Sequence, residues 1–152
     1  VAASLVHPQR TVVVATGDGA FGFNAMEIDT AVRHRVPILI IVANNGSWAI
    51  EVRDQQETHG KVIGTHLQFA DHAAMARAFG LHGERVEQAD QLPSAIACAL
   101  AELAKGRPAL LDAVVTPEAA SSDAKSGLAW VPDLQPLGAW DEAERKWRAT
   151  SV

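Results

Sequence analysis

Two short runs of β-branched and aliphatic residues place the strongest constraint on the fold of this chain. They occupy residues 11–16 (TVVVAT) and 37–43 (PILIIVA). Such nearly continuous apolar runs are typical of parallel strands buried on both faces, so we expect both to be central strands. Between them, residues 24–33 carry apolar side chains at helical spacing, with Asn24 and Glu27 placed as an N-cap and its capping-box partner. The first unit is therefore predicted as strand, helix, strand.

The same alternation continues along the chain. Asp71 is predicted to cap a short helix that ends near Gly80, and residues 84–86 are predicted to form a minor strand. Asp90 opens a further helix with one apolar stripe, and residues 109–116 (ALLDAVVT) form the strand after it. The stripe consists of Leu92, Ile96, Ala99, Leu100 and Leu103. Strands that alternate with helices predict an α/β fold, in which a parallel sheet carries helices on both faces.

The length and the local composition indicate one domain followed by a tail. A chain of 152 residues can bury one sizeable core but not two. From residue 117 the sequence becomes polar and is punctuated by proline and glycine, and residues 139–148 then place Trp140 and Trp147 on one helical face. We expect a domain over residues 1–116 and a tail with a short terminal helix over residues 117–152. We expect this tail to pack either at an interface with another domain or subunit or on the domain's own sheet.

Charge and cysteine content exclude several classes of protein. Thirteen Lys and Arg residues against 18 Asp and Glu residues give a net charge of -5, which argues against non-specific binding of nucleic acid. No apolar run approaches the roughly 20 residues that a membrane-spanning helix needs. The single cysteine, Cys98, cannot form an internal disulfide, so we expect a reducing, cytoplasmic compartment.

The segment from Gly17 to Gly22 (GDGAFG) carries the first chemical signal. It matches the dinucleotide-binding pattern G-x-G-x-x-G, in the expected position between a strand and a helix. That pattern requires an acidic residue about 20 positions later, at the end of the second strand, where this chain has Asn44 and Asn45 instead. Asp18 would also repel a bound pyrophosphate. A Rossmann-type dinucleotide-binding module, in which Asp18 is incidental, is therefore an alternative with two observations against it.

A divalent cation between Asp18 and a diphosphate would remove this electrostatic conflict. Mg²⁺ prefers oxygen ligands, and Asn44 and Asn45 place amide oxygens at the end of the neighbouring strand. The ends of parallel strands are the usual ligand-binding edge of α/β sheets. Taken singly, each segment could be no more than a tight turn. The carboxylate and the amides together favour a cation-dependent phosphate site.

The same residues carry a family resemblance. Gly17-Asp18-Gly19, followed after 24 residues by Asn44-Asn45, resembles the thiamine-diphosphate motif of the superfamily that includes acetolactate synthase, pyruvate decarboxylase and benzaldehyde lyase. The resemblance extends over residues 1–116, and it is far more specific than the dinucleotide pattern. It implies the thiamine-diphosphate-binding fold, with thiamine diphosphate and Mg²⁺ as cofactors.

The resemblance also implies a set of site residues. Asp18, the side chain of Asn45 and the main-chain oxygen of Ser47 would bind Mg²⁺. Main-chain N–H groups would hold the diphosphate, helped by the positive end of the helix expected near Asn24. The complete cofactor-binding set is Gly17, Asp18, Gly19, Ala20, Asn45 and Ser47.

The implied function is part of a larger enzyme. In this superfamily a glutamate of a separate pyrimidine-binding domain, on the same chain or on a second subunit, completes the cofactor site. We therefore expect these 152 residues to be a C-terminal part that is inactive alone. The full-length enzyme would be a homodimer or homotetramer that acts as an acetolactate synthase-like carboligase, decarboxylase or lyase on 2-keto acids or 2-hydroxyacyl substrates. A non-catalytic domain that keeps the fold is a further alternative.

Two residues after the asparagines are candidates for contact with substrate. Glu51 lies where keto-acid decarboxylases of the superfamily have a glutamate, so it is a candidate proton donor or acceptor. It could equally be an exposed helix carboxylate near Arg53. Trp48 would line the substrate pocket, or else cover the edge of the sheet. The six histidines have no spacing typical of a zinc site.

Overall fold

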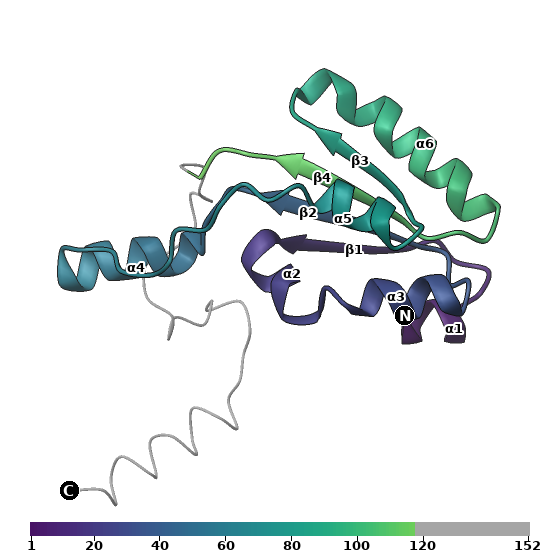
Figure 1. The fold of residues 1–152 in the computed structure, drawn as a ribbon, viewed down its shortest axis with the longest axis horizontal. Coiled ribbons are helices and arrows are strands. Elements are labelled where there is room, and N and C mark those ends of the chain that lie inside the picture. Colours follow the sequence, from purple (N-terminus) through teal and green to yellow (C-terminus); the bar gives the residue numbers. More distant parts are fainter. Residues whose placement is uncertain (118–152) are drawn as a thin grey trace, which may run out of the picture.

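The computed structural model describes residues 1–117, and its elements alternate as the sequence predicts (Figure 1). In chain order they are α1 (Ala2–Val6), β1 (Val12–Gly17), α2 (Asp18–Asn24), α3 (Glu27–Arg33), β2 (Ile38–Asn44), α4 (Ala49–His59), α5 (His72–Ala78), β3 (His82–Val86), the 3₁₀ helix η1 (Ala89–Gln91), α6 (Leu92–Ala104) and β4 (Ala109–Val114). The predicted tail over residues 117–152, with its terminal helix, falls outside the described residues except at its first position. Within residues 1–117 there is no helix with the length and apolar character needed to cross a membrane.

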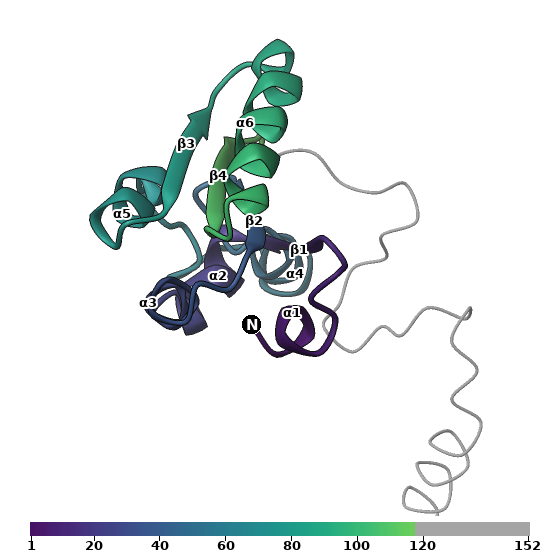
Figure 2. The same cartoon turned by 90° about the vertical axis from the view of Figure 1, so that its right-hand side faces the viewer.

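The four strands form one parallel sheet in the order β1-β2-β4-β3. Helices cover both of its faces: Figure 2 shows α6 on one side and α3 and α5 on the other. The predicted α/β architecture is therefore confirmed. Because all strands run the same way, their carboxyl ends lie along a single edge of the sheet.

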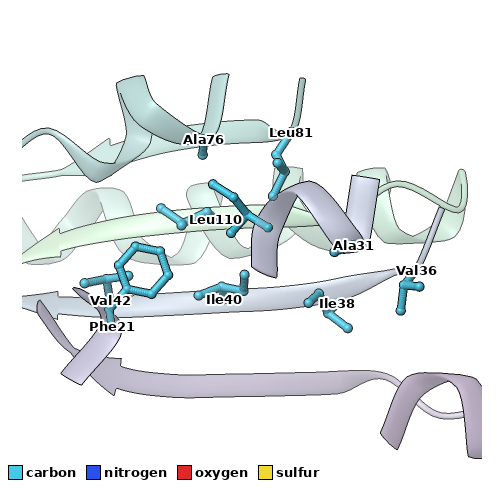
Figure 3. Packing of buried hydrophobic residues seen from close by; sticks show 10 residues of the cluster. Phe21, Ala31, Val36, Ile38, Ile40, Val42, Ala76, Leu81 and Leu110 are labelled. Atoms are coloured by element: carbon cyan, nitrogen blue, oxygen red, sulfur yellow. The ribbon is translucent and has the colours of Figure 1, made fainter. Parts of the chain in front are cut away.

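Alternation of side chains along β2 divides the core into two layers. Ile38, Ile40 and Val42 face the helices α2, α3 and α5, as Figure 3 shows for the larger cluster. Leu39 faces the opposite way and packs with Ala95 and Ala99 of α6. A strand enclosed on both sides in this manner requires an almost continuous apolar sequence, which explains the run that identified β2.

Two expectations about burial are wrong within the described residues. β1 was expected to be a central strand, but it pairs only with β2 there, and Val13 and Val14 are 51% and 38% exposed. The apolar run of β1 indicates a buried strand, but it cannot specify whether a second strand pairs with β1 in the sheet. On α6, Leu100 of the predicted stripe is exposed, whereas Ala95 is fully buried. The helix packs close to the sheet through its alanines. The position of the sheet therefore decides which side of α6 is buried, and the apolar stripe alone does not.

The single helix predicted between the first two strands is two helices, and the first of these begins earlier than predicted. α2 starts at Asp18 directly after β1, with Gly17 as an extended N-cap, and α3 starts only at Glu27. Asn24 is the last residue of α2, and Met26 takes the N-cap position of α3 without a side-chain hydrogen bond. The predicted capping box is therefore wrong. Packing of an aromatic side chain of α2 in the core outweighs the low helix propensity of its glycines.

The other helix boundaries agree with the sequence. The Asp71 carboxylate accepts a hydrogen bond of 2.7 Å from the main-chain N–H of Ala74, which confirms the predicted cap of α5. Gly80 follows the end of this helix with φ of +89°, a conformation that favours glycine. In β3, a Cβ atom at Gly83 would overlap the main-chain oxygen of Ala73. Glycine at this position therefore lets α5 lie directly on the strand.

A small ion-pair cluster joins the end of α6 to the loop before β4. The carboxylate of Glu102 pairs with Lys105, at 2.8 Å, and with Arg107. These hydrogen bonds, first from Lys105 and then from Arg107, lower the pKa of Glu102. The cluster lies at the amino end of β4, opposite the edge where the strands finish.

Candidate functional site

The strand register places the two motif segments next to each other. Gly17, the last residue of β1, pairs with Ala43 of β2. Asp18 follows the first strand at once, whereas Asn44 is the last residue of the second strand and Asn45 follows it. The two segments, 24 residues apart in sequence, therefore meet at the carboxyl edge of the sheet.

Asp18 is buried, although no basic side chain among the described residues pairs with it. Its side chain lies in the first turn of α2, and the residue is only 5% exposed. Its Oδ2 atom is buried without a hydrogen-bond partner among residues 1–117. A buried polar oxygen without a partner costs about 1–3 kcal/mol, and a charged one costs more. A buried oxygen of this kind is expected to gain its missing partner from another molecule or an ion.

Asn45 to Ser47 form a tight turn after β2. The Oδ1 atom of Asn45 accepts hydrogen bonds from the main-chain N–H of Ser47 at 3.0 Å and from its hydroxyl at 3.2 Å. Gly46, between them, has φ of +64°, and a Cβ atom there would lie 2.8 Å from the ring of Phe69. The turn therefore requires glycine both for its conformation and for the space beneath that ring.

A returning segment clamps this turn from outside. The main-chain N–H of Trp48 donates to the oxygen of Thr65 at 2.9 Å, and that of Leu67 donates to the oxygen of Gly46 at 2.7 Å. These two bonds form the antiparallel bridge between Ser47 and His66. Because the bridge uses groups of the flanking residues, it does not use the carbonyl of Ser47. The bridge therefore leaves that oxygen unused, as the expected role of a main-chain metal ligand requires.

Trp48 joins the turn to the start of α2. A Cβ atom at Gly19 would lie 2.8 Å from two atoms of the Trp48 indole ring. The same ring meets Phe23 edge-on, with the ring centroids 5.2 Å apart. Trp48 thus covers the helix turn that carries Asp18, and this contact keeps the two halves of the candidate site together.

Glu51 lies in the first turn of α4 and is partly exposed. None of the residues of α4 is buried, and Figure 1 shows the helix projecting beyond the carboxyl edge of the sheet. Within residues 1–117 the Glu51 carboxylate has no hydrogen bond or ion pair. Glu51 therefore lies at the start of a projecting helix, close to the edge that carries the motif segments.

Sequence reasoning missed a buried cluster behind the turn. Asp112 of β4 is completely buried, and its carboxylate accepts hydrogen bonds from Asn44 and Arg85 and from the main-chain N–H of His72. The signal was present: an aspartate interrupts the apolar run ALLDAVV, where a strand buried on both faces should have none. Its partners come from β2, β3 and α5, which only the fold brings together.

The described residues contain no group of three or more His, Cys, Asp or Glu side chains placed to hold a metal. A cation at this edge would rely instead on one carboxylate with amide and main-chain oxygens, a donor set that suits Mg²⁺ better than a softer metal.

Comparison with known proteins agrees with this geometry. Residues 1–113 match the family described as "Thiamine pyrophosphate enzyme, C-terminal TPP binding domain". The chain belongs to this family. The match confirms the resemblance inferred from the two motif segments, and it identifies the described residues as a thiamine pyrophosphate-binding domain.

Two named relatives are similar to this chain over most of its length. A probable acetolactate synthase of Mycobacterium bovis is 38% identical over 120 residues, and a 2-hydroxyacyl-CoA lyase of Oryza sativa subsp. japonica is 35% identical over 132 residues. These alignments cover 78% and 82% of this chain but only 21% and 22% of the relatives. The chain therefore spans about a fifth of the length of the relatives that it matches.

A solved structure supports the same assignment. Benzoylformate decarboxylase from Polynucleobacter necessarius has a TM-score of 0.67 with this chain at 25% sequence identity. The superposition covers 77% of this chain and 22% of that protein. The parallel sheet with helices on both faces is thus an arrangement that this chain has in common with a larger protein of known structure.

Proposed function

We propose that the carboxyl edge of β1 and β2 binds the diphosphate of thiamine pyrophosphate through Mg²⁺. Asp18, the side-chain oxygen of Asn45 and the main-chain oxygen of Ser47 would hold the cation. Asn45 would exchange one of its two hydrogen bonds from Ser47 for the metal, because an amide oxygen has two lone pairs. The observation that carries this proposal is the buried Oδ2 atom of Asp18, which has no partner among residues 1–117. A divalent cation offsets the cost of burying that carboxylate and attracts the diphosphate to the same point.

The residues that follow Asp18 suit the diphosphate itself. The first N–H groups of a helix have no acceptor within the helix, and the observed start of α2 places Gly19 and Ala20 in that first turn. Gly17 adopts an extended conformation, and a Cβ atom there would meet nothing within 4 Å, so its side of the edge is open. These residues would bind and orient the phosphate oxygens, with the cation bridging to Asp18.

The domain would serve a larger enzyme that resembles acetolactate synthase in its chemistry. Thiamine pyrophosphate supplies an electron sink for making or breaking a carbon–carbon bond next to a carbonyl. We propose substrates of the 2-keto acid or 2-hydroxyacyl class, and the name of the 2-hydroxyacyl-CoA lyase supports the second class. Trp48 would border the pocket, and Glu51, on the projecting α4, would hold or release a proton close to the substrate.

Several further features complete the proposed enzyme. A pyrimidine-binding domain, in the same chain or on a second subunit of a homodimer or homotetramer, would contact the exposed edge near α4. Exposed apolar side chains support such a contact, among them Ile50, 68% exposed, and Phe23, 74% exposed. The exposed thiol of Cys98 suits the reducing conditions of the cytoplasm.

Calorimetry on the intact protein tests the cofactor assignment. Thiamine pyrophosphate is titrated with Mg²⁺ present, and again with a chelator. We expect binding only with Mg²⁺, and we expect Asp18→Ala to abolish it. Asp29→Ala is the matched control, because Asp29 is an exposed carboxylate paired with Arg33 on α3.

Three outcomes would contradict the proposal. Thiamine pyrophosphate binding that is indifferent to chelator would remove the role of the cation. Binding of NAD without metal would favour a dinucleotide-binding module instead. Equal losses in Asp18→Ala and Asp29→Ala would show that the assay reports general damage and not loss of a ligand.

A further inference from the structure

A buried carboxylate lies directly behind the proposed metal-binding turn. Asp112 is 0% exposed, and both of its oxygens are used. Its Oδ1 atom accepts from the side-chain Nδ2 of Asn44 at 2.9 Å. Its Oδ2 atom accepts from the main-chain N–H of His72 at 3.1 Å and from Nη1 of Arg85 at 2.8 Å. Three donors from three different elements thus converge on one carboxylate.

Arg85 supplies the charge that makes this burial possible. Its side chain is 24% exposed and also donates to Glu87 at 2.9 Å. The hydrogen bond to Glu87, together with the negative charge of Asp112, raises the pKa of Arg85 above its ordinary value. Asp112 and Arg85 face each other across the β3–β4 pair, where their Cα atoms are in register.

The carboxylate fixes the orientation of Asn44. Nδ2 of Asn44 donates to Asp112 and also to the main-chain oxygen of Ala70 at 2.9 Å. Two acceptors on one side define which end of the amide is the nitrogen. The other end, Oδ1, is buried without a partner among residues 1–117. Asn44 is thereby held in a single orientation one residue before the proposed ligand Asn45.

The same cluster holds the segment that clamps the turn from outside. Arg85 donates to the main-chain oxygen of Ala70 at 3.1 Å, so Ala70 is tied to both Asn44 and Arg85. Ala70 follows directly on the segment whose Thr65 and Leu67 bond to the turn. Both the residue before the turn and the segment outside it are therefore anchored on the Asp112–Arg85 pair.

We propose that Asp112 and Arg85 are positioning residues for the metal-binding turn at Asn45 to Ser47; this rests on the proposed function. Neither residue touches the cation. Their effect is to hold the turn oxygens at the separation that the cation needs. Fixed ligands matter here because Mg²⁺ tolerates little deviation from octahedral geometry. A buried ion pair adds little net stability, because the cost of desolvating both charges offsets much of their attraction. Stability alone therefore does not explain this pair.

The test compares the Mg²⁺ affinity of variants in the intact protein. Mg²⁺ is titrated by calorimetry at one fixed excess of thiamine pyrophosphate over protein, below the melting temperature of every variant. In Asp112→Asn the amide nitrogen must face at least one of the three donors, so the cluster cannot be fully satisfied. We expect the Kd for Mg²⁺ to rise by about 10-fold, at the lower end of the effect of losing a direct partner of a metal ligand, because Asp112 acts through the neighbouring Asn44. Arg85→Gln keeps two of the three bonds to Asp112 and should give a smaller rise.

Glu102→Gln is the matched control. It also removes a carboxylate with two cationic partners, but at the opposite edge of the sheet. We expect its Kd for Mg²⁺ to stay within about twofold of the unsubstituted protein, as for independent sites. Thermal melting without ligands is recorded for all variants, because a merely structural role would lower the melting temperature without changing the Kd.

The outcomes separate the two proposals. If the unsubstituted protein shows no Mg²⁺-dependent binding, the proposed function fails. If it binds but Asp112→Asn and Arg85→Gln bind Mg²⁺ as tightly, the positioning role is wrong and the cofactor assignment stands. If Asp112→Asn does not fold, Arg85→Gln decides: an unchanged Kd overturns the proposal, and a raised Kd with an unaffected control supports it.

Discussion

Replacing Asp18 with alanine should change stability and binding in opposite directions. Without ligands, the variant loses a buried carboxylate oxygen that has no partner among residues 1–117. Removing that unsatisfied group should raise the free energy of unfolding by about 1–3 kcal/mol. The loss of a negative charge from the first turn of α2 costs about 0.3–1 kcal/mol. We therefore expect the metal-free variant to be more stable than the unsubstituted protein, by up to about 2.7 kcal/mol.

Addition of cofactor should reverse the order. A ligand that binds only the folded state stabilises it by about 2.7 kcal/mol at one hundred times its Kd. The unsubstituted protein should gain this amount with Mg²⁺ and thiamine pyrophosphate, whereas Asp18→Ala should gain nothing. Urea denaturation of the intact protein, with cofactor and with chelator, measures both differences.

One result in particular would refute this reasoning. If Asp18→Ala is less stable than the unsubstituted protein in the presence of chelator, the carboxylate contributes to the fold itself. Its burial would then not be a cost that a cation offsets. Asp29→Ala serves again as the control, because it removes an exposed i, i+4 ion pair and should shift stability only slightly under both conditions.

Two further substitutions test the packing and the charge clusters. Gly19→Ala places a Cβ atom 2.8 Å from the Trp48 ring and should cost about 1–3 kcal/mol in urea denaturation. Combining it with Trp48→Ala should remove most of that penalty, and simple addition of the two losses would disprove the clash. Glu102→Gln should destabilise at neutral pH but not in acid, because the pKa of Glu102 is lowered by folding. That stabilisation is complete above the ordinary value of 4.5 and disappears as the pH falls through the folded pKa, so a difference that persists in strong acid contradicts it.

Much of the architecture could be predicted from local patterns. The apolar run of β2, the cap at Asp71 and the glycine after α5 each follow from periodicity or from the chemistry of a single residue. The start of α2 could not, because the glycines around Asp18 have low helix propensity and only packing in the core makes them helical. The exposure of β1 depends equally on which strands lie beside it.

The sequence by itself determined which residues carry the proposed chemistry. A carboxylate and two amides at the ends of two strands, at a spacing typical of one family, were sufficient to indicate Asp18 and Asn45. Tertiary structure alone decided what holds them in place. Asp112 reaches Asn44 over 68 positions, and Arg85 over 27, because hydrogen bonds in a parallel sheet join residues that no local pattern connects. The ligand types are therefore a property of the motif, and their positions are a property of the fold.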